Sequence, residues 1–303
     1  MTEARATVGA LSRETLARRL AGDGIAVRTG PFVTRLRLPL DELAASLRLL
    51  YADFPVDSSG FADFDVTARR LGRGKIEFLI DGERRFAPVA RGIALPMLEW
   101  AINWCLYTFS HQYLLIHAAV VERKGRALVM TGRPGAGKST LCAALVGRGW
   151  RLFSDEFAVI SPDDGRLWPI ARPIALKNDS IERIRRLVAG AVLGPTSDDT
   201  HKGRVAHMRA PAASVRRADE PARAGWIVFP NRADDGVAAL APVPGGRAFF
   251  RLADNAFNYH FHGAAGFEAV CRMIDACDCL DLGYADLEDA VAALDRLVDG
   301  EAR

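Results

Sequence analysis

The pattern of apolar and polar positions divides the chain into two stretches of different character. The first stretch mixes short alternating segments with amphipathic ones. Helical spacing of apolar residues predicts helices over 12–21, 40–51 and 94–109. Alternation predicts short strands over 25–27, 34–38, 61–69 and 75–80. Residues 1–111 therefore predict a smaller N-terminal α+β domain, and no chemical motif indicates its role.

The second stretch alternates buried strands with helices, which is typical of an α/β domain. Apolar runs predict strands at 114–121, 127–131, 151–153 and 157–160, and Asn258–His262 predicts a strand with two histidines on one face. Helices are predicted over 140–146, 264–276 and 286–297. We place the domain boundary near residue 112, so the second predicted domain covers 112–303.

Composition excludes several classes of protein. The net charge of +3 is too small to indicate a nucleic-acid partner. The most apolar stretch, 94–109, is shorter than the roughly 20 residues of a membrane span and contains Glu99 and Asn103, so no membrane partner is expected. Five cysteines without a secretory signal favour reduced thiols and a cytoplasmic protein.

A glycine-rich loop lies between the predicted strand 127–131 and the predicted helix 140–146. Its residues are Gly132, Arg133, Pro134, Gly135, Ala136, Gly137, Lys138, Ser139 and Thr140. The loop matches the P-loop pattern, in which backbone N–H groups and a helix N-terminus face phosphate oxygens. Lys138 would neutralise the β- and γ-phosphates of ATP, and Ser139 would offer its hydroxyl to Mg²⁺. The alternative is a glycine turn that binds nothing.

Two adjacent carboxylates, Asp155 and Glu156, follow the predicted strand 151–153. A Mg·ATP site needs an acidic partner at the end of a neighbouring strand. One carboxylate can hold Mg²⁺ through water or Ser139, and the other can accept a proton from an attacking hydroxyl. Alternatively, Asp155 starts a turn and Glu156 is solvated.

His117 lies inside the apolar strand predicted at 114–121. This strand should pair near the strand that precedes the P-loop. The histidine is either a satisfied core residue or a group that reaches the phosphate site, and the sequence leaves both open.

The order of these motifs resembles the HPr kinase/phosphorylase family, and more closely its HprK-related kinase A type. The resemblance covers roughly residues 112–262. It runs from Ile116-His117-Ala118 through the P-loop to Asp155-Glu156, and then to Pro242-Val243-Pro244-Gly245-Gly246-Arg247 and Ala256-Phe257-Asn258. It implies a P-loop kinase domain of the HPr-kinase and phosphoenolpyruvate-carboxykinase-like type.

The resemblance also implies roles for individual residues. Lys138 and Ser139 would bind phosphate and magnesium, Asp155 would be the base or a metal-side carboxylate, and Arg247 would lie near the transferred phosphoryl group. A surface arginine is the alternative for Arg247. The family further implies a homo-oligomer. The chain departs from the family in having Asp155-Glu156 instead of two aspartates, and Arg133-Pro134 instead of Asp-Ser in the loop.

Three functions fit these motifs. The first is an ATP-dependent kinase that phosphorylates a serine or similar hydroxyl of a peptide or small protein. The second is a small-molecule kinase that acts on free serine or a sugar. The third is a module that binds ATP in order to grip a peptide and transfers no phosphate.

Overall fold

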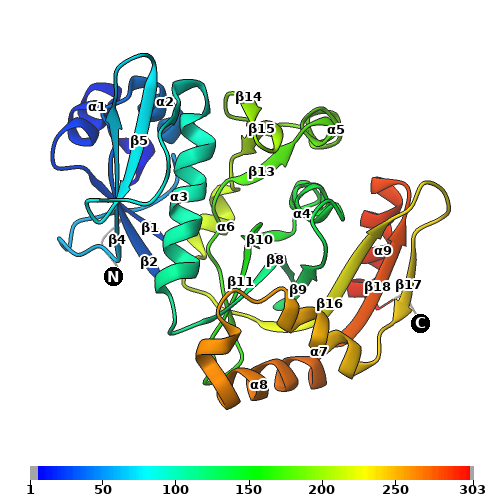
Figure 1. The fold of residues 1–303 in the computed structure, drawn as a ribbon. Helices are drawn as coiled ribbons and strands as arrows, with labels where there is room; N and C mark the ends of the chain where they lie inside the picture. The colour runs from blue at the N-terminus through cyan, green and yellow to red at the C-terminus, as the bar shows by residue number, and fades with distance from the viewer. Residues whose placement is uncertain (1–5, 301–303) are drawn as a thin grey trace. The chain divides into compact units, whose positions relative to one another are not determined.

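A computed structural model describes residues 6–300 and shows a mixed α/β chain in two compact units (Figure 1). The first unit comprises Met1–Phe109, Ala171–Glu182 and Gly190–Asp219. The second comprises Ser110–Ile170, Arg183–Ala189 and Glu220–Arg303. Among the described residues, no helix is both long enough and apolar enough to cross a membrane.

The first unit is built on a seven-stranded sheet with the order β3-β1-β2-β4-β5-β6, in which β7 also pairs with β5. The pair β2–β4 is parallel and the other pairs are antiparallel. Its strands are β1 (Ile25–Thr29), β2 (Phe32–Arg37), β3 (Val56–Asp57), β4 (Phe64–Arg70), β5 (Lys75–Ile80), β6 (Glu83–Arg84) and β7 (Val89–Ala90). Its helices are η1 (Val8–Ala10), α1 (Arg13–Ala21), α2 (Asp41–Leu50), η2 (Arg91–Ile93) and α3 (Ala94–Phe109).

A second, three-stranded sheet with the order β13-β15-β14 also belongs to the first unit. Its elements are β13 (Ile174–Lys177), β14 (Ser197–Thr200) and β15 (Gly203–Met208), followed by α6 (Ala212–Arg216). Arg172, which precedes β13, donates to the Glu99 carboxylate of α3 at 2.8 Å, and the Tyr51 hydroxyl donates to the same carboxylate at 2.7 Å. All three side chains are buried.

This buried cluster explains why the units differ from the predicted domains. Along the chain, the first boundary between the units falls between Phe109 and Ser110, near the domain boundary predicted at residue 112. However, two later segments return to the first unit, because the Arg172–Glu99 ion pair and the Arg209–Asp53 ion pair join them to α3 and to the loop after α2. Motifs of the second half gave no indication of these long-range pairs.

The second unit has an eight-stranded sheet with the order β12-β11-β8-β9-β16-β18-β17, in which β10 also pairs with β8. Its strands are β8 (Leu114–Arg123), β9 (Arg126–Thr131), β10 (Arg151–Ser154), β11 (Phe157–Ile160), β12 (Leu167–Trp168), β16 (Arg223–Arg232), β17 (Ala239–Pro242) and β18 (Asp278–Tyr284). The helices are α4 (Lys138–Gly147), α7 (Gly245–Asp254), α8 (Tyr259–Asp275) and α9 (Leu287–Asp299), while α5 (Asp179–Leu187) belongs to both units.

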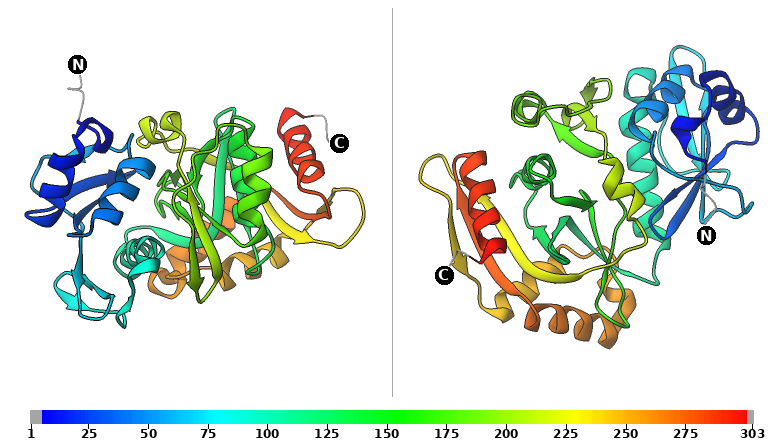
Figure 2. Two further views of the ribbon diagram at one scale, coloured as in Figure 1. Left: turned by 90° about the horizontal axis from the view of Figure 1, so that it is seen from above. Right: turned by 180° about the vertical axis from the view of Figure 1, so that it is seen from behind.

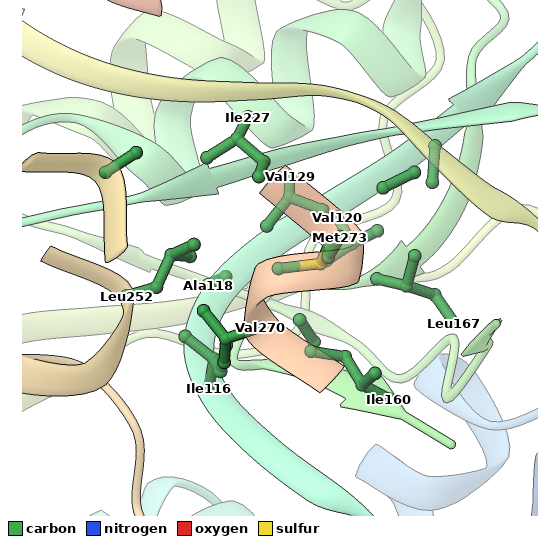
Figure 3. Close-up of a cluster of buried hydrophobic side chains, with 14 of the residues drawn as sticks. Ile116, Ala118, Val120, Val129, Ile160, Leu167, Ile227, Leu252, Val270 and Met273 are labelled. Atoms are coloured by element: carbon green, nitrogen blue, oxygen red, sulfur yellow. The ribbon is translucent and has the colours of Figure 1, made fainter. Parts of the chain in front are cut away.

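Helices cover both faces of this sheet (Figures 1 and 2). On one face, α7 and α8 pack on a core of strand residues that includes Ile116, Ala118 and Val120 of β8, as Figure 3 shows. On the other face lies α4, which contacts β8 and α9. Asp286 caps α9 by accepting from the backbone N–H groups of Glu288 and Asp289, which explains why this predicted helix begins there.

Residues 258–262 begin a helix, so their prediction as a strand is wrong. The Asn258 side chain accepts from the Leu115 backbone N–H at 2.9 Å and donates to the Tyr113 carbonyl at 2.8 Å. These bonds attach the start of α8 to the start of β8. His260 and His262 therefore do not share a face as they would in a strand, because residues two apart diverge around a helix.

The buried ion pair makes a testable contribution to stability. Replacing Arg172 by methionine should lower the free energy of unfolding by about 3–5 kcal/mol, because Glu99 would remain buried without its counter-charge. Urea denaturation measures this change. The matched control is Arg204→Met, whose partner Asp198 is exposed and whose loss should cost less than about 1 kcal/mol. Equal losses from the two substitutions would show that the buried pair has no special role.

Candidate functional site

The loop between β9 and α4 has the conformation that its glycines predict. Gly135 and Gly137 have φ angles of 85° and 90°, in the left-handed region that favours glycine. Lys138 begins α4 and is buried, and its Nζ donates to the carbonyls of Gly132 at 2.7 Å and Arg133 at 3.2 Å. The ammonium group thus lies over the loop that would surround a phosphate.

The rest of the loop is open to solvent. Arg133, Pro134 and Gly135 are exposed, and Ser139 and Thr140 are half-buried in the first turn of α4. Side chains built on Gly132 or Gly135 would meet no other atom. The loop therefore leaves space next to its backbone, as a phosphate site requires.

Tyr284, the last residue of β18, packs against this loop. Its hydroxyl donates to the Ala136 carbonyl at 3.1 Å, and a Cβ on Gly137 would lie only 2.0 Å from the hydroxyl oxygen. Burial raises the pKa of this hydroxyl, although Arg232 and Arg183 oppose that shift, so Tyr284 remains a donor. No motif in the sequence indicates a role for Tyr284, because a tyrosine at the end of an alternating segment carries no local signal.

Strand pairing brings the acidic pair close to the loop. Strands β9 and β10 both run antiparallel to β8, one on each of its edges, so they are parallel to each other. Strand β9 ends at Thr131, which pairs with Ala118 of β8. On the other edge of β8, β11 begins with Phe157, which pairs with His117. Asp155 and Glu156 lie between β10 and β11, level with the end of β9.

Asp155 is buried and lies close to α4. Asp155 is buried at the end of β10, and its charge, after burial itself, raises the pKa of the Cys142 thiol in α4. The Cys142 sulfur in turn lies 4.0 Å from the Ser154 carbonyl. The structure thus brings the predicted carboxylate to the helix that follows the loop.

His117 and Glu156 form a second part of the site. Ile116 and Ala118 pack against α7 and α8, so His117 faces the α4 side because neighbouring strand residues alternate. Its Nδ1 lies 3.7 Å from the Glu156 carboxylate and 3.2 Å from the Glu156 carbonyl. Thr131 Oγ1 donates to the His117 carbonyl at 2.8 Å, which connects the end of β9 to this strand. Both side chains are partly exposed.

Arg247 lies elsewhere in the second unit. It lies in the first turn of α7, where its backbone N–H donates to the Pro244 carbonyl at 2.9 Å, and the residue is exposed. Helix α7 covers the face of the sheet opposite α4 (Figure 1). The structure does not bring Arg247 to the loop, and its role in phosphoryl transfer stays a prediction.

The described residues can supply only some of the ligands of a metal ion. No three histidine, cysteine, aspartate or glutamate side chains among residues 6–300 are grouped so that they could hold a metal. Mg²⁺ at a nucleotide site takes most of its ligands from phosphate and water and needs only one or two protein oxygens. A hydroxyl on α4 and a carboxylate at the end of β10 fit that requirement.

The contact between Gly137 and Tyr284 can be tested by substitution. Alanine at Gly137 or at Gly135 strains the backbone similarly, but only Gly137→Ala collides with Tyr284. We expect Gly137→Ala to lower the free energy of unfolding by about 1–3 kcal/mol more than Gly135→Ala does. Denaturant titration of the two variants measures the difference. Adding Tyr284→Phe to Gly137→Ala should recover part of the loss, and no recovery would contradict the proposed contact.

Comparison with known proteins finds limited similarity. A family model described as "ScmC: SynChlorMet cassette protein ScmC" matches residues 90–180, a stretch that contains the loop and the acidic pair. The search of curated proteins returned no match. Among solved structures, the chain is similar to the Hpr(Ser) kinase/phosphatase from Coxiella burnetii, with 12% sequence identity. That match covers 61% of this chain and 98% of the other, and its TM-score of 0.28 is too low to support an argument.

Proposed function

We propose that this chain is an ATP-dependent phosphotransferase that phosphorylates a serine or similar hydroxyl of a peptide or small protein. One observation carries the proposal: a buried aspartate directly after β10 lies level with the end of β9 and close to the helix that begins with Lys138. A glycine turn without function needs no buried carboxylate beside it. The acceptor class rests on the resemblance to HPr kinases.

ATP would be held by the segment Gly132–Thr140. The backbone N–H groups of the loop and the N-terminus of α4 would face its phosphates, and Lys138 would exchange the carbonyls of Gly132 and Arg133 for phosphate oxygens. Magnesium, when bound, would neutralise phosphate charge. Ser139 would hold the ion directly, and Asp155 or Glu156 would hold it directly or through water.

Asp155 would act as the base. The acceptor oxygen would form a bond to the γ-phosphorus while the bond to the ADP oxygen breaks, and the hydroxyl proton would pass to the Asp155 carboxylate. Burial close to α4 suits this role, because the carboxylate is shielded from bulk water there. Glu156 would orient the His117 ring through their 3.7 Å contact, next to the same strand ends.

The two assigned roles predict different losses. Lys138→Ala should abolish ATP binding and transfer, because it removes the charge that faces the phosphates. Asp155→Asn should leave ATP affinity within about tenfold of the wild type and lower kcat by about 100-fold to 10,000-fold. Calorimetry measures ATP binding, and transfer of labelled γ-phosphate to a library of serine peptides measures turnover.

Two exposed residues of the same unit are matched controls. Lys124→Ala removes a lysine at the turn before β9, and Asp234→Asn removes a carboxyl in the loop after β16. Both should behave as wild type. An active Asp155→Asn variant would refute the role of that carboxylate. ATP binding without transfer to any peptide, free serine or sugar would instead identify an ATP-gated binding module, and transfer to a small molecule alone would refute the peptide acceptor.

A further inference from the structure

A cavity in the second unit lies where β9 and β16 begin, away from the glycine-rich loop. Its volume is about 460 Å³, which is within the usual range of small-molecule sites. Four arginines line it (Arg126, Arg166, Arg223 and Arg272), together with a single carboxylate, Asp164. The formal charge around the cavity is therefore strongly positive, whereas that of the whole chain is close to neutral.

Two of the arginines are direct neighbours across a pair of strands. Arg126 of β9 and Arg223 of β16 occupy opposite positions in the parallel ladder. Like charges in that arrangement repel each other and destabilise a sheet. No ion pair with a carboxylate joins either residue within the described part of the chain. An anion bound between the two guanidinium groups would remove this repulsion.

Neighbouring residues make room for the Arg126 side chain. It lies over the ring of Trp226, 4.9 Å from the ring centroid, and a Cβ on Gly225 would be 2.8 Å from its Nε. Glycine at 225 therefore leaves the space that the guanidinium group occupies. The stacking on Trp226 orients the guanidinium without neutralising its charge.

The remaining charges at the cavity are partly engaged. Arg166 lies 3.3 Å from Asp164. The pKa of the Asp164 carboxyl is lowered first by the Arg166 backbone N–H, then by the Ser161 side chain and the charge of Arg166, and least by the charge of Arg223. Arg272 donates to the Pro162 carbonyl at 2.6 Å and lies 3.9 Å from Glu268. These contacts hold the two rim arginines in place and leave the cross-strand pair for a ligand.

We infer that this cavity binds a phosphorylated small molecule with two or more negative charges. Its phosphate oxygens would bridge Arg126 and Arg223, since a planar guanidinium matches a phosphate group in geometry and charge. The organic part would contact the apolar residues Ala224 and Met273, which also line the cavity. Strand β9 separates the cavity from the glycine-rich loop by six residues, or roughly 20 Å, so the two are different sites.

Pyrophosphate is a suitable probe. It is added to the Lys138→Ala variant, because the glycine-rich loop of the wild type would also bind pyrophosphate. We expect this variant to bind one pyrophosphate per chain in calorimetry at constant ionic strength. Adding Arg223→Gln should weaken that binding by at least about tenfold, the effect of about 1.4 kcal/mol. Adding Arg296→Gln, which changes an exposed arginine of α9, should leave it unchanged.

Thermal denaturation provides a second readout that does not depend on activity. Without phosphate, Arg223→Gln should not lower Tm, because it removes a repulsion between strands. With pyrophosphate, Tm should rise in the Lys138→Ala protein and not in the protein that also carries Arg223→Gln. Absence of pyrophosphate binding, binding that Arg223→Gln does not weaken, or equally tight binding of citrate would each overturn the inference. None of these outcomes depends on whether the glycine-rich loop transfers phosphate.

Discussion

The candidate site depends on the pairing of β8 with different strands along its two edges. Strand β9 runs antiparallel along one edge, and β10 followed by β11 runs antiparallel along the other. This pairing makes β9 and β10 parallel, and they end opposite Ala118 and Val120, near the centre of β8. A loop that starts at the end of β9 and a carboxylate at the end of β10 must then lie on neighbouring parts of the same sheet edge. The short sequence distance from the loop to Asp155 follows, because α4 has only 10 residues and β10 returns directly to β8.

Two contacts hold the loop, one near its start and one near its end. The Lys138 ammonium donates to the carbonyls of Gly132 and Arg133. The Tyr284 hydroxyl donates to the Ala136 carbonyl and packs against Gly137. The tyrosine comes from β18, which reaches the loop only because β16 lies between β18 and β9. The shape of the loop is therefore a property of the whole sheet as well as of its glycines.

Much of the sheet around the loop could be predicted from local pattern. The strands β8, β9, β10 and β11 are apolar runs, and the glycine motif indicates the loop and the helix after it. Strands β16 and β18 were not predicted: β16 contains Pro230 and Asn231, and the apolar residues of β18 are interrupted by Asp278 and Asp281. Position 258 was misinterpreted because its role is a tertiary one, with its amide bonded to β8 at a distance of 143 residues in the chain. Periodicity detects a buried face, but it does not identify the partner that buries it.

The two ends of β9 show why some anion sites can be read from a sequence and others cannot. At its carboxyl end, the proposed phosphate ligands are consecutive backbone groups, so the requirement appears as a short run of glycines with a lysine. At its amino end, the cations are side chains of two strands that are almost 100 residues apart, and neither Arg126 nor Arg223 belongs to a motif. Only the strand register makes them neighbours, and no ion pair with a carboxylate among residues 6–300 offsets their repulsion. A site built from side chains of distant strands is recognised in the folded chain by like charges that lie close together. No local sequence pattern contains that information.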